Sequence, residues 1–233
     1  MKRKWILPSI YLLVVLGMLS TLQFGSRSVT VLSQRTPIER QHSIVIDPGH
    51  GGIDGGATSC TGVLESNLNL EISLRLNDLF HFLGYHTRMI RSSDCSVYTS
   101  GDTIAQKKIS DLKQRVQMVE ETPNPVLLSI HQNNFPDGRY SGPQVFYGRG
   151  GESSALAETL QSALVRHLNP GSNRKTKQAK GIYLMEHIQC TGVLVECGFL
   201  SNVREEQLLK TPEYQKKLCA VIASTVCSFL SNT

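Results

Sequence analysis

The sequence lacks the features of a disulfide-stabilised or repetitive protein. It has no internal repeat, no low-complexity tract and no C-x-x-C pair, and its six cysteines are scattered. Cys219 and Cys227 are eight residues apart on one predicted helix, a separation of about 12 Å that a disulfide cannot bridge. A chain of this length does not need such cross-links. We therefore predict that most cysteines are small buried hydrophobic residues, and a Cys60–Cys95 pair stays open as an alternative.

The net charge of the chain is also small. The formal net charge is +5, and Lys2, Arg3 and Lys4 supply three of these positive charges. The rest of the chain is therefore near +2, which is too weak to predict nucleic-acid binding. A charge of this size is compatible with an anionic wall or membrane surface.

The long apolar run of this chain lies at its N-terminus. Residues 5–24 follow the three cations, and such a run is long enough to cross a bilayer as a helix. Residues 21–24 offer no small-x-small cleavage site. We therefore expect residues 1–24 to be an uncleaved membrane anchor or signal, with the remainder exported. Residues 25–42 are polar and predict a linker, so the catalytic or binding domain should span residues 43–233.

Strand-like and helix-like segments alternate within residues 43–233, and this alternation predicts an α/β sheet covered by helices. Short β-rich runs predict strands at 43–46, 85–90, 126–130, 144–147, 182–185 and 193–195. Apolar residues at helical spacing predict helices around 68–83, 109–119, 156–168 and 212–229.

Three of the predicted strands lead into residues that bind metals or carry protons, namely His50, His131 and Glu196. Ligands in open α/β sheets bind beyond the carboxyl ends of the strands, so these residues should meet at one edge. Glu65 opens the following helix, where the helix dipole favours its charge. Catalytic zinc takes three protein ligands, usually histidines with a carboxylate. His50, Glu65 and His131 are therefore candidate zinc ligands, and Glu196 is a candidate general base.

Each of these residues also has a simpler interpretation when taken alone. His50 could be a turn residue, His131 a satisfied core histidine and Glu196 a buried ion-pair partner. However, the glycines around His50 leave its imidazole uncovered, and an acid after four apolar strand residues is costly without a strong reason. Taken together, the residues favour a metal site.

Four motifs occur in a fixed order: DPGHGG at residues 47–52, then Glu65, then SIHQN at 129–133, then VECGFLSN at 195–202. In this order they resemble the zinc-dependent N-acetylmuramoyl-L-alanine amidases of the amidase-3 type, over about residues 43–231. The resemblance implies zinc ligands His50, Glu65 and His131, catalytic Glu196, and a mostly parallel, about six-stranded sheet flanked by helices. It also implies the family's reaction, which is hydrolysis of the amide between the lactyl group of N-acetylmuramic acid and L-alanine in peptidoglycan.

Within this family the chain resembles the germination-specific amidases of spore-forming bacteria. The resemblance rests on the single predicted anchor, the absence of wall-binding repeats, and the segments 135–147 and 181–185. That subgroup contributes to muramic δ-lactam formation in the spore cortex, where a separate deacetylase completes the step. The resemblance implies an extracytoplasmic protein, membrane-anchored or secreted, on the forespore or cortex side. Its partners would be peptidoglycan, the membrane through the N-terminal helix, and in some cases an activator protein.

Further residues near the motifs are candidates for substrate contact. Asn133 follows the second histidine, and Arg91 and Arg115 belong to segments that also resemble the family. A structural ion pair at the sheet edge is the favoured alternative for the two arginines. Gln132 and Asn134 depart from the family, which usually has smaller or aliphatic residues there, and both could alter the peptide pocket.

Two other functions fit the same residues. A zinc peptidase or carboxypeptidase could act on the stem peptide with the same ligands and base, because this chemistry does not specify the flanking sugar. A non-catalytic cell-wall-binding protein could retain the fold. The presence of every expected catalytic residue argues against the second of these alternatives.

Overall fold

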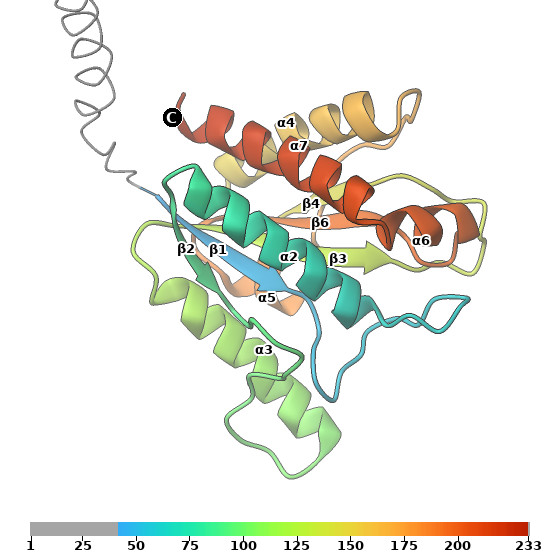
Figure 1. The fold of residues 1–233 in the computed structure, drawn as a ribbon. Coiled ribbons are helices and arrows are strands. Elements are labelled where there is room, and N and C mark those ends of the chain that lie inside the picture. Colours follow the sequence, from blue (N-terminus) through green and yellow to red (C-terminus); the bar gives the residue numbers. More distant parts are fainter. Residues whose placement is uncertain (1–41, 233) are drawn as a thin grey trace, which may run out of the picture. The chain divides into compact units, whose positions relative to one another are not determined.

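The structure is a computed structural model that describes residues 42–232. These residues form a six-stranded sheet in the order β2-β1-β3-β6-β4-β5, covered by helices (Figure 1). The strands are β1 (Ser43–Pro48), β2 (His86–Met89), β3 (Pro125–Asn133), β4 (Gln144–Tyr147), β5 (Lys177–Gln178) and β6 (Thr191–Phe199). The helices are α2 (Glu65–Phe82), α3 (Ile104–Glu120), α4 (Gly151–Leu168), α5 (Tyr183–His187), α6 (Val203–Leu209) and α7 (Pro212–Leu230).

The sheet is mixed and mostly parallel. β1 pairs in parallel with β2 and β3, β3 pairs in parallel with β6, and β4 pairs in parallel with β5. β4 runs antiparallel to β6. The central strands β1, β3 and β6 therefore end at the same edge of the sheet, where open α/β sheets build their sites.

Alternate residues of the central strands enter two separate cores. Ile44 and Ile46 of β1 belong to the core formed with α2, α4 and α7, whereas Val45 belongs to the core formed with α3 and α5. Figure 1 shows these helices on opposite faces of the sheet. In β3, Leu128 belongs to the core with α2, α4 and α7, and Leu127 belongs to the core with α3 and α5. Burial on both faces requires continuous apolar strands, which is why these runs were recognisable in the sequence.

One predicted strand is a helix. Residues 182–185 were expected in the sheet, but α5 covers Tyr183–His187, with Leu184 and Met185 buried in the core on the α3 side. A short apolar run has the same pattern in a strand as in a turn of buried helix, so periodicity alone does not separate the two. The two-residue strand β5 and the short helix α6 were not predicted from the sequence.

The predicted anchor, residues 1–24, lies outside the described residues, as does the predicted linker apart from His42. From residue 42 to residue 232, no helix is both long enough and apolar enough to cross a membrane.

All six cysteines are free thiols. Cys197 and Cys219 are buried, as predicted for small hydrophobic residues, and two others are partly buried. Cys60 and Cys95 are exposed and are not joined to each other, so the alternative of a disulfide between them is not realised.

A buried ion pair fastens α3 to the end of β1. Arg115 Nη1 donates a hydrogen bond to Asp47 Oδ1 at 2.5 Å, and both side chains are buried. Ser129 Oγ of β3 donates to Asp47 Oδ2 at 2.6 Å, so the carboxylate connects three elements. Although burial opposes its charge, Arg115 and Ser129 lower the pKa of Asp47 below its ordinary value. Breaking such a pair is costly because one partner becomes an unpaired buried charge.

Replacing Arg115 by methionine should lower the free energy of unfolding by about 3 kcal/mol or more, because Asp47 then lacks its buried counter-ion. Urea unfolding followed by circular dichroism measures the change. The folded-state pKa of Asp47 lies below its unfolded value, so the stabilisation is present above about pH 5 and is lost as the pH falls below about 4. The difference in the free energy of unfolding between the wild type and Arg115→Met should therefore decrease in acid. A difference that stays constant down to about pH 3 would contradict the ion pair as its cause.

Candidate active site

A tight turn immediately after β1 holds His50. Its φ of 61° is positive, which is uncommon for a residue with a side chain and indicates a locally constrained backbone. Gly51 and Asp54 close the turn through reciprocal backbone hydrogen bonds of 2.7 and 3.2 Å. The turn therefore places the His50 imidazole at the carboxyl edge of the sheet.

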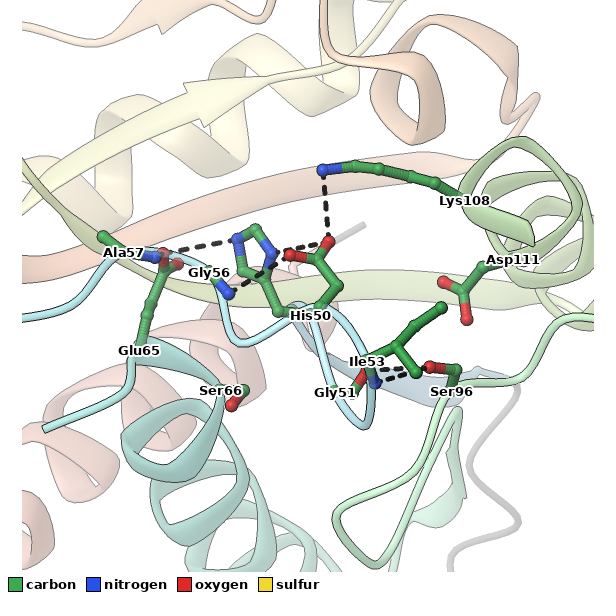
Figure 2. Close-up of polar contacts among 12 residues, drawn as sticks. His50, Gly51, Ile53, Gly56, Ala57, Glu65, Ser66, Ser96, Lys108 and Asp111 are labelled. Atoms are coloured by element: carbon green, nitrogen blue, oxygen red, sulfur yellow. Dashed lines mark hydrogen bonds and ion pairs between the residues drawn. The ribbon is translucent and has the colours of Figure 1, made fainter. Parts of the chain in front are cut away.

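Glu65 is the first residue of α2, and its carboxylate lies between two imidazoles. Oε2 lies 3.3 Å from His50 Nε2 and accepts a hydrogen bond of 3.0 Å from the backbone N–H of Ala57 (Figure 2). Oε1 lies 2.9 Å from His131 Nδ1. The Glu65 side chain is only 6% exposed, so these contacts are shielded from bulk water.

His131 enters the site from the end of β3. Its imidazole packs so closely against Gly49 that a Cβ atom at that position would collide with the ring. A Cβ atom at Gly56 would likewise collide with the Glu65 carboxylate and the His50 ring. Both positions require glycine because the side chains of the site fill the space that a larger residue would take.

His50, Glu65 and His131 each offer one ligand atom, and these atoms all lie within 4.8 Å of one another. Although burial opposes its charge, the two histidines lower the pKa of Glu65 well below its usual range. Glu65 and Asp54 raise the pKa of His50 despite its burial. Carboxylates that favour a proton on this histidine also favour a metal cation in its place. Two imidazoles with one carboxylate are a donor set that suits zinc.

Glu196 lies beside this cluster on β6, where the register pairs it with His131 of β3. Burial raises the pKa of Glu196 to about 7; the nearby Glu65 charge adds to the effect and the histidines oppose it. Its Oε2 atom is buried and has no hydrogen-bond partner among residues 42–232. A carboxylate with a pKa near neutrality and an unengaged oxygen is suited to accept a proton.

Two residues that the sequence analysis did not identify brace the cluster. Asp54 Oδ2 lies 3.0 Å from His50 Nδ1 and 3.2 Å from Lys108 Nζ. Asn69 Nδ2 donates to Glu65 Oε1 at 3.3 Å. Outer partners of this kind fix the orientation of metal-binding side chains. The helical spacing of four residues between Glu65 and Asn69 is a signal that could have revealed the second contact, whereas Asp54 lies in a turn that carries no periodic signal.

Gln132 contacts the inner side of the site. It is 3% exposed, its Nε2 donates to Asn69 Oδ1 at 3.2 Å, and its backbone N–H donates to Glu65 Oε1 at 3.2 Å. The Gln132 side chain thus supports Asn69, which in turn contacts Glu65. An effect of Gln132 on the peptide pocket stays a prediction. Asn134 is exposed, and Asn133 is partly exposed at the end of β3. A substrate contact by Asn133 stays a prediction.

Arg91 and Arg115 are buried and bind the backbone of the turn that carries His50. Arg91 Nε donates to the carbonyl of Pro48 at 2.9 Å, and its Nη2 donates to the carbonyl of Gly49 at 3.0 Å. Arg115 Nη2 donates to the carbonyl of His50 at 2.7 Å. Arg115 forms the structural ion pair that was expected, with Asp47, whereas Arg91 has a structural role through backbone carbonyls and forms no ion pair within residues 42–232. Substrate contact by either arginine stays a prediction.

Comparison with known proteins finds relatives over most of this chain. Residues 44–228 match the amidase-3 family, described as N-acetylmuramoyl-L-alanine amidase. The germination-specific N-acetylmuramoyl-L-alanine amidase of Bacillus subtilis is 37% identical over 190 residues, which are 81% of this chain and 79% of that protein. Among solved structures, the chain is similar to the CwlD amidase from Clostridioides difficile in complex with the GerS lipoprotein. The TM-score is 0.78 at 34% identity, and the match covers 82% of this chain and 99% of that chain. An N-acetylmuramoyl-L-alanine amidase from Clostridium difficile 630 gives a TM-score of 0.71 with 29% identity, over 84% of this chain and all of that one.

The family match includes every strand of the sheet except the first residue of β1. It also spans the turn around His50, the start of α2 and the strand ends that carry His131 and Glu196. The family resemblance drawn from the sequence motifs is thereby confirmed. The chain belongs to the N-acetylmuramoyl-L-alanine amidase family.

Proposed function

We propose that this protein is a zinc-dependent amidase that hydrolyses the bond between the lactyl group of N-acetylmuramic acid and L-alanine in peptidoglycan. The observation that carries the proposal is the meeting of His50, Glu65 and His131 beside Glu196 at one sheet edge. A metal-binding trio next to a proton-accepting carboxylate is suited to the hydrolysis of an amide. Family membership supports the choice of bond and substrate.

The residues of the site fit a zinc ion. Two imidazoles and one carboxylate leave a coordination position open for a reactant. The glycines at positions 49 and 56 leave room for the His131 ring and for the Glu65 carboxylate beside His50, and Asp54 and Asn69 hold these side chains in orientation. When bound, zinc would polarise the substrate carbonyl and make water more acidic.

Glu196 would carry the proton transfers. Burial raises the pKa of this carboxyl group above its ordinary value, which makes the carboxylate a stronger base towards the attacking water. The protonated carboxyl group can then donate that proton to the nitrogen of the departing L-alanine. The buried environment thus makes one side chain effective first as a base and then as an acid.

The proposal extends to the spore cortex as the site of action. It is supported by the 37% identity with the germination-specific amidase of Bacillus subtilis. The CwlD amidase forms a complex with the GerS lipoprotein, which supports an activator protein as a partner for this chain. Residues 1–24 are the proposed membrane anchor, and peptidoglycan outside the membrane is the proposed substrate.

The released products test the proposed bond. The zinc-loaded full-length chain, incubated with purified cortex peptidoglycan, should release intact stem peptides with a free L-alanine amino group, as identified by mass spectrometry. Cleavage within the stem peptide would replace the amidase with a zinc peptidase. Tight wall binding without any released peptide would support the non-catalytic alternative.

Glu196→Gln should retain bound zinc and reduce kcat by about 10²- to 10⁴-fold, because the variant cannot accept the proton. Metal content is measured by atomic emission and turnover by peptide release. Glu71→Gln is the matched control, because Glu71 lies on α2 and bonds Gln215 away from the site. If Glu196→Gln loses zinc together with activity, Glu196 is a ligand and the roles must be reassigned.

Gly49→Ala should displace the His131 imidazole, because the added methyl group collides with the ring. We expect zinc affinity to fall by about tenfold or more, measured by competition with a chelator. Gly151→Ala is the control, since nothing lies within 4 Å of the methyl group added there. Unchanged zinc affinity in Gly49→Ala would show that this placement of His131 is not needed to bind the metal.

A further inference from the structure

Within the described part of the chain, Arg174 lies near the site without a direct ion pair, whereas Arg115 and Lys108 are each held by a carboxylate. Arg115 is paired with Asp47, and Lys108 is paired with Asp54. Within residues 42–232, Arg174 forms no ion pair.

The sheet register places Arg174 close to the catalytic carboxylate. Gln144, the first residue of β4, lies directly opposite Glu196 of the antiparallel neighbour β6. Opposite residues in such a pair project from the same face of the sheet, with their Cβ atoms about 5 Å apart. Arg174 Nη1 donates to Gln144 Oε1 at 3.0 Å. One side chain therefore separates the guanidinium group from Glu196.

Aromatic rings hold this guanidinium group in place. Its central carbon lies 4.6 Å from the centroid of the Phe199 ring and 5.9 Å from that of Tyr140, and the two rings stack. Arg174 Nε also donates to the carbonyl of Ser141 at 2.8 Å. Among the described residues, Nη2 has no hydrogen-bond partner. A guanidinium group fixed in this way loses little conformational freedom when it binds a ligand.

Glu205 is the acid that interacts electrostatically with Arg174, and its oxygens are already engaged. Oε1 accepts from the backbone N–H of Gly142 at 2.7 Å, and Oε2 accepts from that of Phe199 at 2.8 Å. Burial raises the pKa of Glu205 although Arg174 acts in the opposite direction. Glu205 therefore stabilises the surrounding loops and leaves the outer edge of Arg174 free.

We propose that Arg174 binds the free carboxylate on the second residue of the stem peptide, and that it thereby favours acidic over amidated stem peptides. This inference rests on the proposed function. The lactyl carboxyl group of the sugar is consumed in the bond that is cut, so the free carboxylates of the substrate lie in its peptide. A planar guanidinium group forms two parallel, charge-assisted hydrogen bonds with a carboxylate, whereas a carboxamide offers only one acceptor oxygen and no negative charge. The position of Arg174, one side chain from the base, suits the residue next to the cleaved bond.

Two matched peptides test this proposal. One is L-Ala-γ-D-Glu-L-Lys with a free α-carboxyl group on the glutamate, and the other carries a carboxamide at that position. Titration of the zinc-loaded full-length protein by calorimetry should give a dissociation constant about tenfold or more lower for the acid peptide. Arg174→Gln should bind the two peptides equally. Lys175→Gln, which removes the adjacent exposed cation, should keep the preference.

The other outcomes overturn the inference. These are equal binding of the two peptides by the wild type, no binding of either at millimolar concentration, or a preference that survives in Arg174→Gln. If Arg174 only held the surrounding loops in place, its removal would weaken the binding of both peptides to the same extent and lower the melting temperature of the protein. Should Arg174→Gln fail to fold, Arg174→Lys retains the charge and must retain part of the preference.

Failure of this inference is distinguishable from failure of the proposed function. Release of intact stem peptides from peptidoglycan by the wild type, without discrimination between the matched peptides, leaves the amidase assignment in place and removes the role of Arg174. Absence of any released stem peptide removes the amidase assignment itself.

Discussion

The carboxylate of Glu65 is the interaction on which the site depends, because it connects the helical layer to the sheet at the point where chemistry is proposed. It contacts His50 from the turn after β1, His131 from the end of β3 and Asn69 from its own helix. Glu65 opens α2, whose position is set by the apolar core that its inner face shares with the sheet. Because close-packed cores transmit small displacements, a change in that packing would reach the side chains proposed to bind the metal.

The site uses two buried carboxylates in opposite ways. Glu65 is surrounded by hydrogen-bond donors and imidazoles, which keep it ionised and hold its pKa far below the ordinary value. Glu196 lies on the neighbouring strand with a buried, unpartnered oxygen, and its pKa is raised to about 7. The difference between them follows from their hydrogen-bond partners, since both are buried. An ionised carboxylate suits a metal ligand, whereas a carboxyl group that exchanges its proton near neutrality suits an acid–base role.

Much of the fold and the centre of the site could be predicted from the sequence, because the signals were local. Continuous apolar runs marked β1, β3 and β6, and parallel strands bring the residues that follow them to one edge. The segment 182–185 was misassigned because a buried turn of helix and a short strand share the same apolar pattern. The contact of Gln132 with Asn69 joins residues far apart in the chain. Local sequence patterns do not predict a contact of that kind, so it is found only in the folded structure.

The constrained turn around His50 explains the structural role of two buried arginines, Arg91 and Arg115. Positive φ at His50 accompanies a turn in which the carbonyls of Pro48, Gly49 and His50 receive side-chain donors. Buried carbonyls require hydrogen-bond donors, and arginine offers several in a fixed fork. Arg91 and Arg115 are used in this way. The guanidinium group proposed to bind the substrate therefore belongs to another residue, Arg174, which contacts Gln144 at the start of β4.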